Sequence, residues 1–185
     1  MRSKLGVVGL AVAAVLAIAC GAGSGQTESS VGGGSQDNVP ANGEAPAGPV
    51  TAAMGQTVTL TNTFLNDTTT VEVTLANPQQ VTEADFLGPK NGLYYVVTVT
   101  IVCTEGTYTA NPSAFKFVAA DGTVYDWTIT GRFDPTLSFT ELNAGQRTSG
   151  NIVFDVPPAA LEGGKIQMDG IGLDFDEPAA YWTTV

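Results

Sequence analysis

The sequence contains no histidine, only two cysteines and few charged residues, which make up 14% of the chain. Histidine is a common general base near neutral pH and a common ligand of transition metals. Its absence excludes histidine-based catalytic triads, and Cys20 and Cys103 are too few for a paired-cysteine zinc site. No phosphate-binding loop, nucleophile elbow or dinucleotide-binding glycine pattern occurs. We therefore expect a protein that is not an enzyme and carries no cofactor.

Basic residues are also scarce, with seven Lys and Arg against 18 Asp and Glu and a formal net charge of -11. Arg2 and Lys4 lie in a segment that we expect to be removed, so the processed chain would be more acidic still. Nucleic acids bind clustered Lys and Arg. The composition therefore argues against a nucleic-acid partner and favours a soluble, acidic surface.

Residues 1–19 have the organisation of a secretory signal peptide. Arg2 and Lys4 provide a positive start, and residues 5–19 are uncharged and mostly apolar. A membrane-spanning helix needs about 20 apolar residues, so this run is short for a span. We expect the segment to direct export and to be cleaved.

Cys20 follows the small residues of LAIACG, which resembles a bacterial lipobox. The resemblance implies that the thiol of Cys20 receives a diacylglyceryl group and that cleavage before it leaves an acylated amino terminus. Several acyl chains anchor a protein much more firmly than one. This predicts a lipoprotein held at the extracytoplasmic face of the cell membrane. The alternative is cleavage after Ala19, which would leave a free thiol.

Residues 20–49 are expected to form the lipidated cysteine and a disordered tether. Gly, Ser, Ala and Pro dominate this stretch, and its only bulky aliphatic side chains are Val31 and Val39. Such a composition buries too little apolar surface to offset the entropy of ordering. A flexible chain of this length reaches on the order of 30 Å.

Residues 50–185 are expected to form an all-β domain, an antiparallel immunoglobulin-like β-sandwich of seven to nine strands. Apolar and polar residues alternate in short segments that end at turn residues, which is the pattern of half-buried strands. Asn77-Pro78 is expected to end the second strand. The predicted strands cover residues 57–62, 69–76, 93–103, 115–130 as a hairpin, 137–142, 148–156, 165–168 and 172–175.

Two of these strands allow predictions about individual side chains. The alternation in residues 93–103 places Cys103 on the core face, where a lone cysteine is a small hydrophobe, although a reactive thiol is the alternative. In the hairpin, a three-residue loop ending at Gly122 aligns Phe117 with Tyr125, and also Phe115 with Trp127. This register keeps the aromatic side chains on one face.

The order YYVVTVTIV, FKFVAADGTVYDW and LNAGQRTSGNIVFDVPP resembles a domain of unknown function found in actinobacterial and firmicute envelope lipoproteins. That family is related to a mycobacterial secreted immunogenic antigen with a telokin-like, immunoglobulin-like sandwich. The similarity covers residues 55–175 and is most specific at residues 145–157. It implies an antiparallel sandwich and an extracytoplasmic location, and it supplies no catalytic residues.

Carboxylates and aromatic side chains are the remaining candidates for a binding site. Asp174, Asp176 and Glu177 are weak candidates for calcium, which takes six to eight oxygen ligands. A second acidic group, near the hairpin, comprises Asp121, Asp126 and Asp134. Surface acids without a ligand are the alternative for both. The aromatic candidates for a binding face are Tyr94, Tyr181 and Trp182, although Tyr181 or Trp182 could instead cap the edge of the sandwich.

We infer a membrane-anchored interaction module that recognises an envelope or extracellular protein. Loops on a rigid sandwich commonly carry recognition. The alternative is a lipoprotein that binds an ion or small molecule, such as calcium, or that assists a transporter. A surface antigen without a specific ligand is a further alternative.

Overall fold

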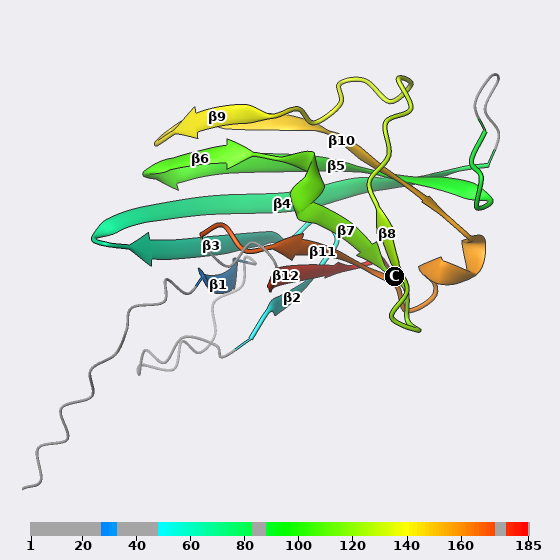
Figure 1. The fold of residues 1–185 in the computed structure, drawn as a ribbon, viewed down its shortest axis with the longest axis horizontal. Helices are drawn as coiled ribbons and strands as arrows, with labels where there is room; N and C mark the ends of the chain where they lie inside the picture. The colour runs from blue at the N-terminus through cyan, green and yellow to red at the C-terminus, as the bar shows by residue number, and fades with distance from the viewer. Residues whose placement is uncertain (1–26, 33–47, 83–87, 173–176, 185) are drawn as a thin grey trace, which may run out of the picture.

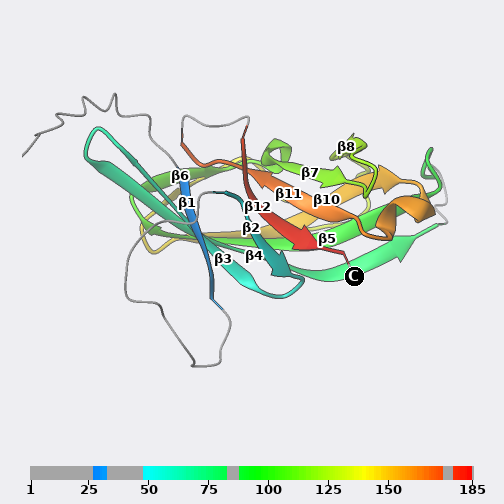
Figure 2. The same ribbon diagram turned by 90° about the horizontal axis from the view of Figure 1, so that it is seen from below.

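The computed structural model describes residues 27–32, 48–82, 88–172 and 177–184, and it contains two five-stranded sheets packed face to face (Figure 1, Figure 2). The first sheet has the order β1-β3-β4-β5-β10, and every neighbouring pair in it is antiparallel. Its strands are β1 (Thr27–Gly32), β3 (Thr57–Phe64), β4 (Asp67–Val81), β5 (Leu93–Glu105) and β10 (Arg147–Val156).

The second sheet has the order β2-β12-β11-β7-β8 and is antiparallel except for its β12–β2 pair, which is parallel. Its strands are β2 (Val50–Ala53), β7 (Phe115–Val118), β8 (Val124–Asp126), β11 (Lys165–Asp169) and β12 (Pro178–Thr183). A separate pair joins β6 (Thr107–Ala110) to β9 (Thr140–Asn143), and two single turns of 3-10 helix are η1 (Pro112–Ala114) and η2 (Pro158–Leu161). The antiparallel sandwich predicted from the alternation is confirmed. The described part of residues 50–185 holds eleven strands, more than the seven to nine expected, because strands of three or four residues show too little alternation to be recognised.

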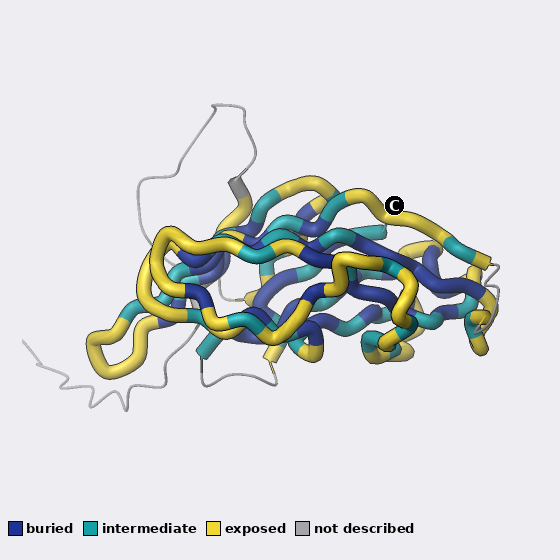
Figure 3. The backbone as a smooth tube through the Cα atoms, turned by 90° about the horizontal axis from the view of Figure 1, so that it is seen from above, coloured by how far each residue is buried: buried dark blue, intermediate teal, exposed yellow. Residues whose placement is uncertain are grey.

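The core lies between the two sheets, and β5 contributes most to it because one whole face of the strand is buried (Figure 3). The residues of this face are each at most 2% exposed: Leu93, Tyr95, Val97, Val99, Ile101 and Cys103. The second sheet contributes Phe117, Ile166 and Trp182 to the same core, and all three are fully buried. Tyr95 and Phe117 meet edge to face with ring centroids 5.7 Å apart, a favourable aromatic geometry.

The β7–β8 hairpin has the predicted three-residue loop. Ala119 and Thr123 close it through an N–H···O bond of 2.9 Å, and Gly122 has φ 88°, which glycine adopts readily. Phe117 pairs with Tyr125, as expected. The predicted alignment of Phe115 with Trp127 is wrong, because β8 ends at Asp126 and Trp127 instead forms a bridge with Phe154 of β10.

The expectation that Asn77-Pro78 ends the second strand is also wrong. Ala76 pairs with Thr98 and Gln79 pairs with Val96, so Asn77 and Pro78 together oppose one residue of β5. This is a β-bulge, and Asn77 takes a left-handed conformation with φ 52°. A bulge accommodates proline because it removes the ladder position at which the missing N–H would be needed. β4 therefore continues to Val81.

Thr27–Gly32 lies within the stretch expected to be a disordered tether, yet it forms β1 and pairs antiparallel with β3. The expectation is corrected for these six residues. Their apolar content is low, so the pairing depends on the backbone groups that β3 offers at its edge. Ser29 is buried at 6% exposure in this arrangement. The signal peptide, Cys20 and the rest of the tether up to residue 47 lie outside the described residues.

The last described strand, β12, was not predicted from the sequence. Most of the predicted strand 172–175 lies outside the described residues, and the last described strand is β12. Pro178 and two alanines open β12, and these residues are poor indicators of a strand. Its Trp182 is fully buried and its indole N–H donates to the Gln56 carbonyl oxygen at 3.0 Å, so it is a core residue.

Candidate interaction surface

Residues 127–139, which we call the edge segment, lie along the outer edge of β10, where the first sheet would otherwise end unpaired. The N–H of Leu137 donates to the Asn151 carbonyl oxygen at 3.0 Å. The N–H of Asn151 donates to the Pro135 carbonyl oxygen at 2.7 Å. The Asn151 side-chain amide also donates to the Phe133 carbonyl oxygen at 3.0 Å. These bonds fix the backbone of the edge segment to a rigid strand.

The inward side of the edge segment is apolar. The ring of Phe133 meets Tyr94 edge to face at 6.1 Å, above a small cluster that also contains Val96 and Val153. Tyr94 is only 6% exposed, so the interpretation of Tyr94 as an exposed binding residue is wrong. Its ring was expected on the solvent side of β5, and the edge segment covers that side.

Gly150 allows the edge segment to lie this close to β10. A Cβ atom added at Gly150 would lie 2.4 Å from the backbone nitrogen of Leu137, well inside van der Waals contact. Leu137 itself is 2% exposed. The absence of a side chain at position 150 is therefore a packing requirement.

The outward side of the edge segment presents two large apolar side chains to solvent. Ile129 is 75% exposed and Phe139 is 65% exposed. Apolar side chains held out from a fixed backbone lose little entropy when a partner covers them. Sequence reasoning missed this surface, because nothing in residues 127–139 indicates that they are bound to β10.

The acidic hairpin group does not converge on a cation. The Asp121 carboxylate accepts from the backbone N–H of Thr123 at 2.9 Å, and this bond lowers the pKa of Asp121. Asp126 lies opposite Lys116 in the hairpin. Among the residues that the structure describes, no group of three or more Asp, Glu, Cys or His side chains could hold a metal ion.

The carboxyl-terminal calcium candidates are only partly described. Asp174 and Asp176 lie outside the described residues. Glu177 is exposed, and its carbonyl oxygen accepts from the N–H of Gly170 at 2.9 Å. Cys20, the expected lipidation site, also lies outside the described residues.

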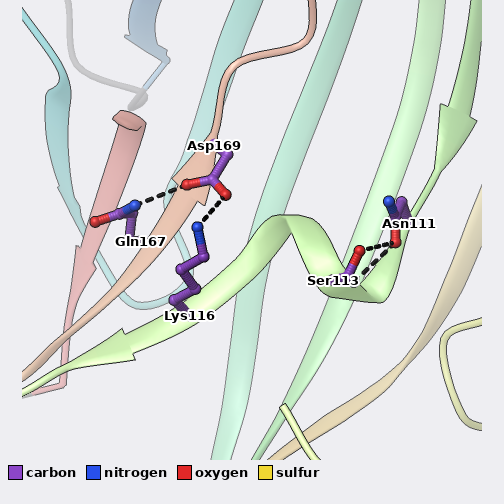
Figure 4. A network of polar contacts seen from close by, with 5 residues as sticks. All are labelled: Asn111, Ser113, Lys116, Gln167 and Asp169. Carbon is purple, nitrogen blue, oxygen red and sulfur yellow. Dashed lines mark hydrogen bonds and ion pairs between the residues drawn. The ribbon is translucent and has the colours of Figure 1, made fainter. Parts of the chain in front are cut away.

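One charged group on the outer face of the second sheet is almost completely covered (Figure 4). The side chain of Asp169 is 7% exposed and accepts from Lys116 Nζ and from Gln167 Nε2, both at 2.7 Å. Both carboxylate oxygens of Asp169 have a donor, which a buried charge requires. Nearby, the side-chain oxygen of Asn111 caps η1 by accepting from Ser113. The ion pair between Lys116 and Asp169 joins β7 to β11, so Asp169 has a structural role.

The remaining aromatic and thiol candidates are structural. Lys165 Nζ lies 3.7 Å from the ring centroid of Tyr181 in a cation–π contact, and Tyr181 is half-buried. Cys103 is fully buried, and burial raises the pKa of its thiol. The prediction that Cys103 lies on the core face as a small hydrophobe is confirmed.

These features define an immunoglobulin-like β-sandwich with an apolar segment fixed along one sheet edge. The chain belongs to the family described as Domain of unknown function (DUF4352), whose model matches residues 53–174. The resemblance inferred from the strand sequences is thereby confirmed. No curated protein matches the chain.

The solved structures that are similar to this chain include one protein of Mycobacterium tuberculosis and two of Bacillus subtilis. MPT63, described as a secreted protein from Mycobacterium tuberculosis, has a TM-score of 0.57 and 24% identity, with 74% of this chain and 98% of that chain covered. For yjhA of Bacillus subtilis the TM-score is 0.47 and the identity 10%, over 54% of this chain and 74% of that chain. For ycdA of Bacillus subtilis, provisionally described as a lipoprotein, the TM-score is 0.47 and the identity 16%, over 56% of this chain and 32% of that chain. The likeness to MPT63 shows the fold.

Proposed function

We propose that this protein is a non-enzymatic, lipid-anchored lipoprotein of the cell envelope that binds another envelope or extracellular protein through the edge segment. The observation that carries the proposal is the exposure of Ile129 and Phe139 on a backbone that is fixed to β10. Exposed apolar side chains on a rigid support are typical of protein contacts.

The location rests on the sequence before the sandwich. The apolar run of residues 5–19 and the lipobox-like LAIACG motif support export and acylation at Cys20. The described residues include no helix of the length and hydropathy that crossing a membrane requires. The likeness of the fold to MPT63, which is described as a secreted protein, supports an extracytoplasmic setting.

Site-specific photo-crosslinking in intact cells tests the binding partner. A photoreactive amino acid replaces Ile129 in one variant and Phe139 in another, and the exposed turn residue Ala144 provides the matched control position. We expect one saturable protein adduct from positions 129 and 139 and none from 144.

The anchor is tested in the same cells with Cys20→Ala. We expect this variant to leave the membrane fraction and to lose the adduct, since the partner is reached from the envelope. A diffuse set of adducts that is the same at positions 129, 139 and 144 would contradict the proposed interaction surface.

A further inference from the structure

The tip of the β3–β4 hairpin is exposed at one end of the molecule (Figure 3) and carries apolar side chains. Phe64 ends β3, and Leu65 and Asn66 form the turn that leads into Asp67 of β4. Leu65 is 78% exposed and Phe64 is 39% exposed. In Figure 1 the hairpin extends to the end of the long axis of the sandwich.

The backbone of the turn does not favour the residue found there. Leu65 has φ 48° and Asn66 has φ 79°, so both lie in the left-handed region. Asn and Gly adopt this region with little strain, whereas an L-residue with a bulky side chain is disfavoured. The turn thus presents a leucine to solvent at a position where asparagine or glycine would fit better, and such outliers point to function.

Strand β1 begins beside this same tip. Thr27 pairs with Asn62, and Gly32 pairs with Thr57, so β1 begins beside the tip and runs away from it (Figure 2). The end of β1 that leads back to Cys20 therefore lies two residues from Phe64 along the neighbouring strand. Six residues separate Cys20 from Thr27. Even fully extended, that stretch spans at most about 25 Å.

We propose that Phe64 and Leu65 enter the interface of a phospholipid bilayer beside the lipid anchor. This inference rests on the proposed acylation of Cys20, which would bring the bilayer within reach of the tip. The only charged residue in residues 63–68 is Asp67, so the contact depends on apolar side chains and not on anionic lipid. The short connection keeps the effective concentration of the tip at the bilayer high, so two side chains suffice to orient the sandwich.

A bilayer fits this position better than a protein partner does. Thr27, the first residue of β1, lies beside the tip, and the membrane is the surface to which the proposed anchor ties that end of the strand. In this orientation Ile129 lies far from the bilayer, because Thr128 binds Val153 in the half of β10 that pairs with Val96 of β5. Thr70 of β4, on the tip side of the sheet, pairs with the opposite end of β5 at Glu105, on the order of 30 Å from Val96 along the strand. The edge segment would then face outward, available to a partner.

Depth-dependent tryptophan quenching tests the contact. The chain from Cys20 onward keeps every described strand, and its Cys20 thiol can be coupled to a maleimide lipid because Cys103 is buried. Vesicles of phosphatidylcholine carry bromine near the headgroup end of the acyl chains. Phe64→Trp reports the tip, Ile129→Trp is the matched exposed control, and the unchanged chain gives the background of Trp127 and Trp182.

We expect the added tryptophan at position 64 to be quenched at least about twice as strongly as that at position 129, since only the tip enters the interface. Adding Leu65→Asn to Phe64→Trp should reduce the quenching without lowering the melting temperature, because asparagine suits the left-handed turn. Equal quenching at positions 64 and 129 would overturn the proposal. A tip that binds a protein and not the bilayer would give this result. The coupling supplies the anchor, so this result is independent of whether Cys20 is acylated in cells, which mass spectrometry of the membrane fraction decides.

Discussion

At the scale of single residues, burial decides the chemistry of the thiol and phenol groups in the core. Cys103 Sγ lies 3.4 Å from the Glu105 carbonyl oxygen and 3.5 Å from that of Gly106, within hydrogen-bonding distance for sulfur. Burial raises the pKa of this thiol, which lowers the fraction of the nucleophilic thiolate at neutral pH. Cys103 therefore acts as a core side chain.

A disulfide reagent tests this role in the Cys20→Ala background, where Cys103 is the remaining cysteine. We expect no reaction with the native protein over a time in which the urea-unfolded protein reacts completely, because the thiol is both covered and protonated. Absorbance of the released thiol follows the reaction. Rapid reaction without denaturant would contradict the burial of Cys103.

The hydroxyl of Tyr95 is buried without a hydrogen-bond partner among the described residues, and burial raises its pKa to about 12. Tyr95→Phe removes the uncompensated polar group and keeps the ring against Phe117. We expect the free energy of unfolding to rise by about 1 kcal/mol at pH 7, measured by urea denaturation. Tyr95→Leu is the contrasting variant and should lower stability, since it loses the aromatic contact. A loss of stability in Tyr95→Phe would show that the hydroxyl is satisfied.

The same residue predicts a pH dependence. The pKa of Tyr95 is raised in the folded state, so the neutral phenol favours folding below the unfolded pKa of about 10, and this contribution disappears as the pH rises towards 12. The stability advantage of Tyr95→Phe should therefore widen by roughly 2 kcal/mol between pH 9 and pH 12, at 1.36 kcal/mol per pKa unit. A constant difference between the two proteins across that range would contradict the assignment.

At the scale of elements, alternation in the sequence identified the strands that have one face in the core and missed those that depend on a neighbour. The alternating apolar residues of β5 predicted its buried face, including Cys103, and Gly122 predicted the loop of the β7–β8 hairpin. Strand β1 has almost no apolar pattern, and β12 begins with Pro178. Both strands form because an existing edge offers backbone groups, and a single sequence does not encode that information locally.

Hydrogen exchange tests the pairing of β1. Replacing residues 27–32 with an alternating Gly-Ser sequence of the same length keeps the backbone N–H and C=O groups of β1. It raises the conformational entropy that this segment loses when it pairs with β3. We expect faster hydrogen exchange, measured by mass spectrometry, at those amides of Thr57–Phe64 that face β1. Exchange in β5 should not change, so β5 is the internal control. Unchanged protection of β3 would contradict a stable β1–β3 pair.

The edge segment makes a separate prediction through Gly150. Gly150→Ala places a methyl group against the backbone of Leu137 in a conformation that alanine can adopt, so the loss is steric. We expect stability to fall by about 1–3 kcal/mol, as for an overpacked core, together with loss of the photo-adduct at position 129. Gly48→Ala is the control, since nothing lies within 4 Å of its added Cβ atom, and it should leave both properties unchanged.

At the scale of the whole molecule, the sandwich and its family were predictable from the sequence, whereas the candidate surface was not. The strand order and the Gly150–Pro157 region carried the resemblance that the family match confirms. The exposure of Ile129, Phe139 and Leu65 follows from how distant strands are placed, so no local pattern reveals it. In the arrangement that we propose, the hairpin tip lies towards the membrane and the edge segment lies away from it.

The central claim is that the sandwich is held in the envelope by a lipid at Cys20. Mass spectrometry of the amino-terminal peptide, purified from the membrane fraction of cells that produce the full chain, tests it most directly. We expect a peptide that begins at Cys20 and carries the added mass of a diacylglyceryl group. An unmodified amino terminus at Cys20, with the protein in the culture medium, would contradict it.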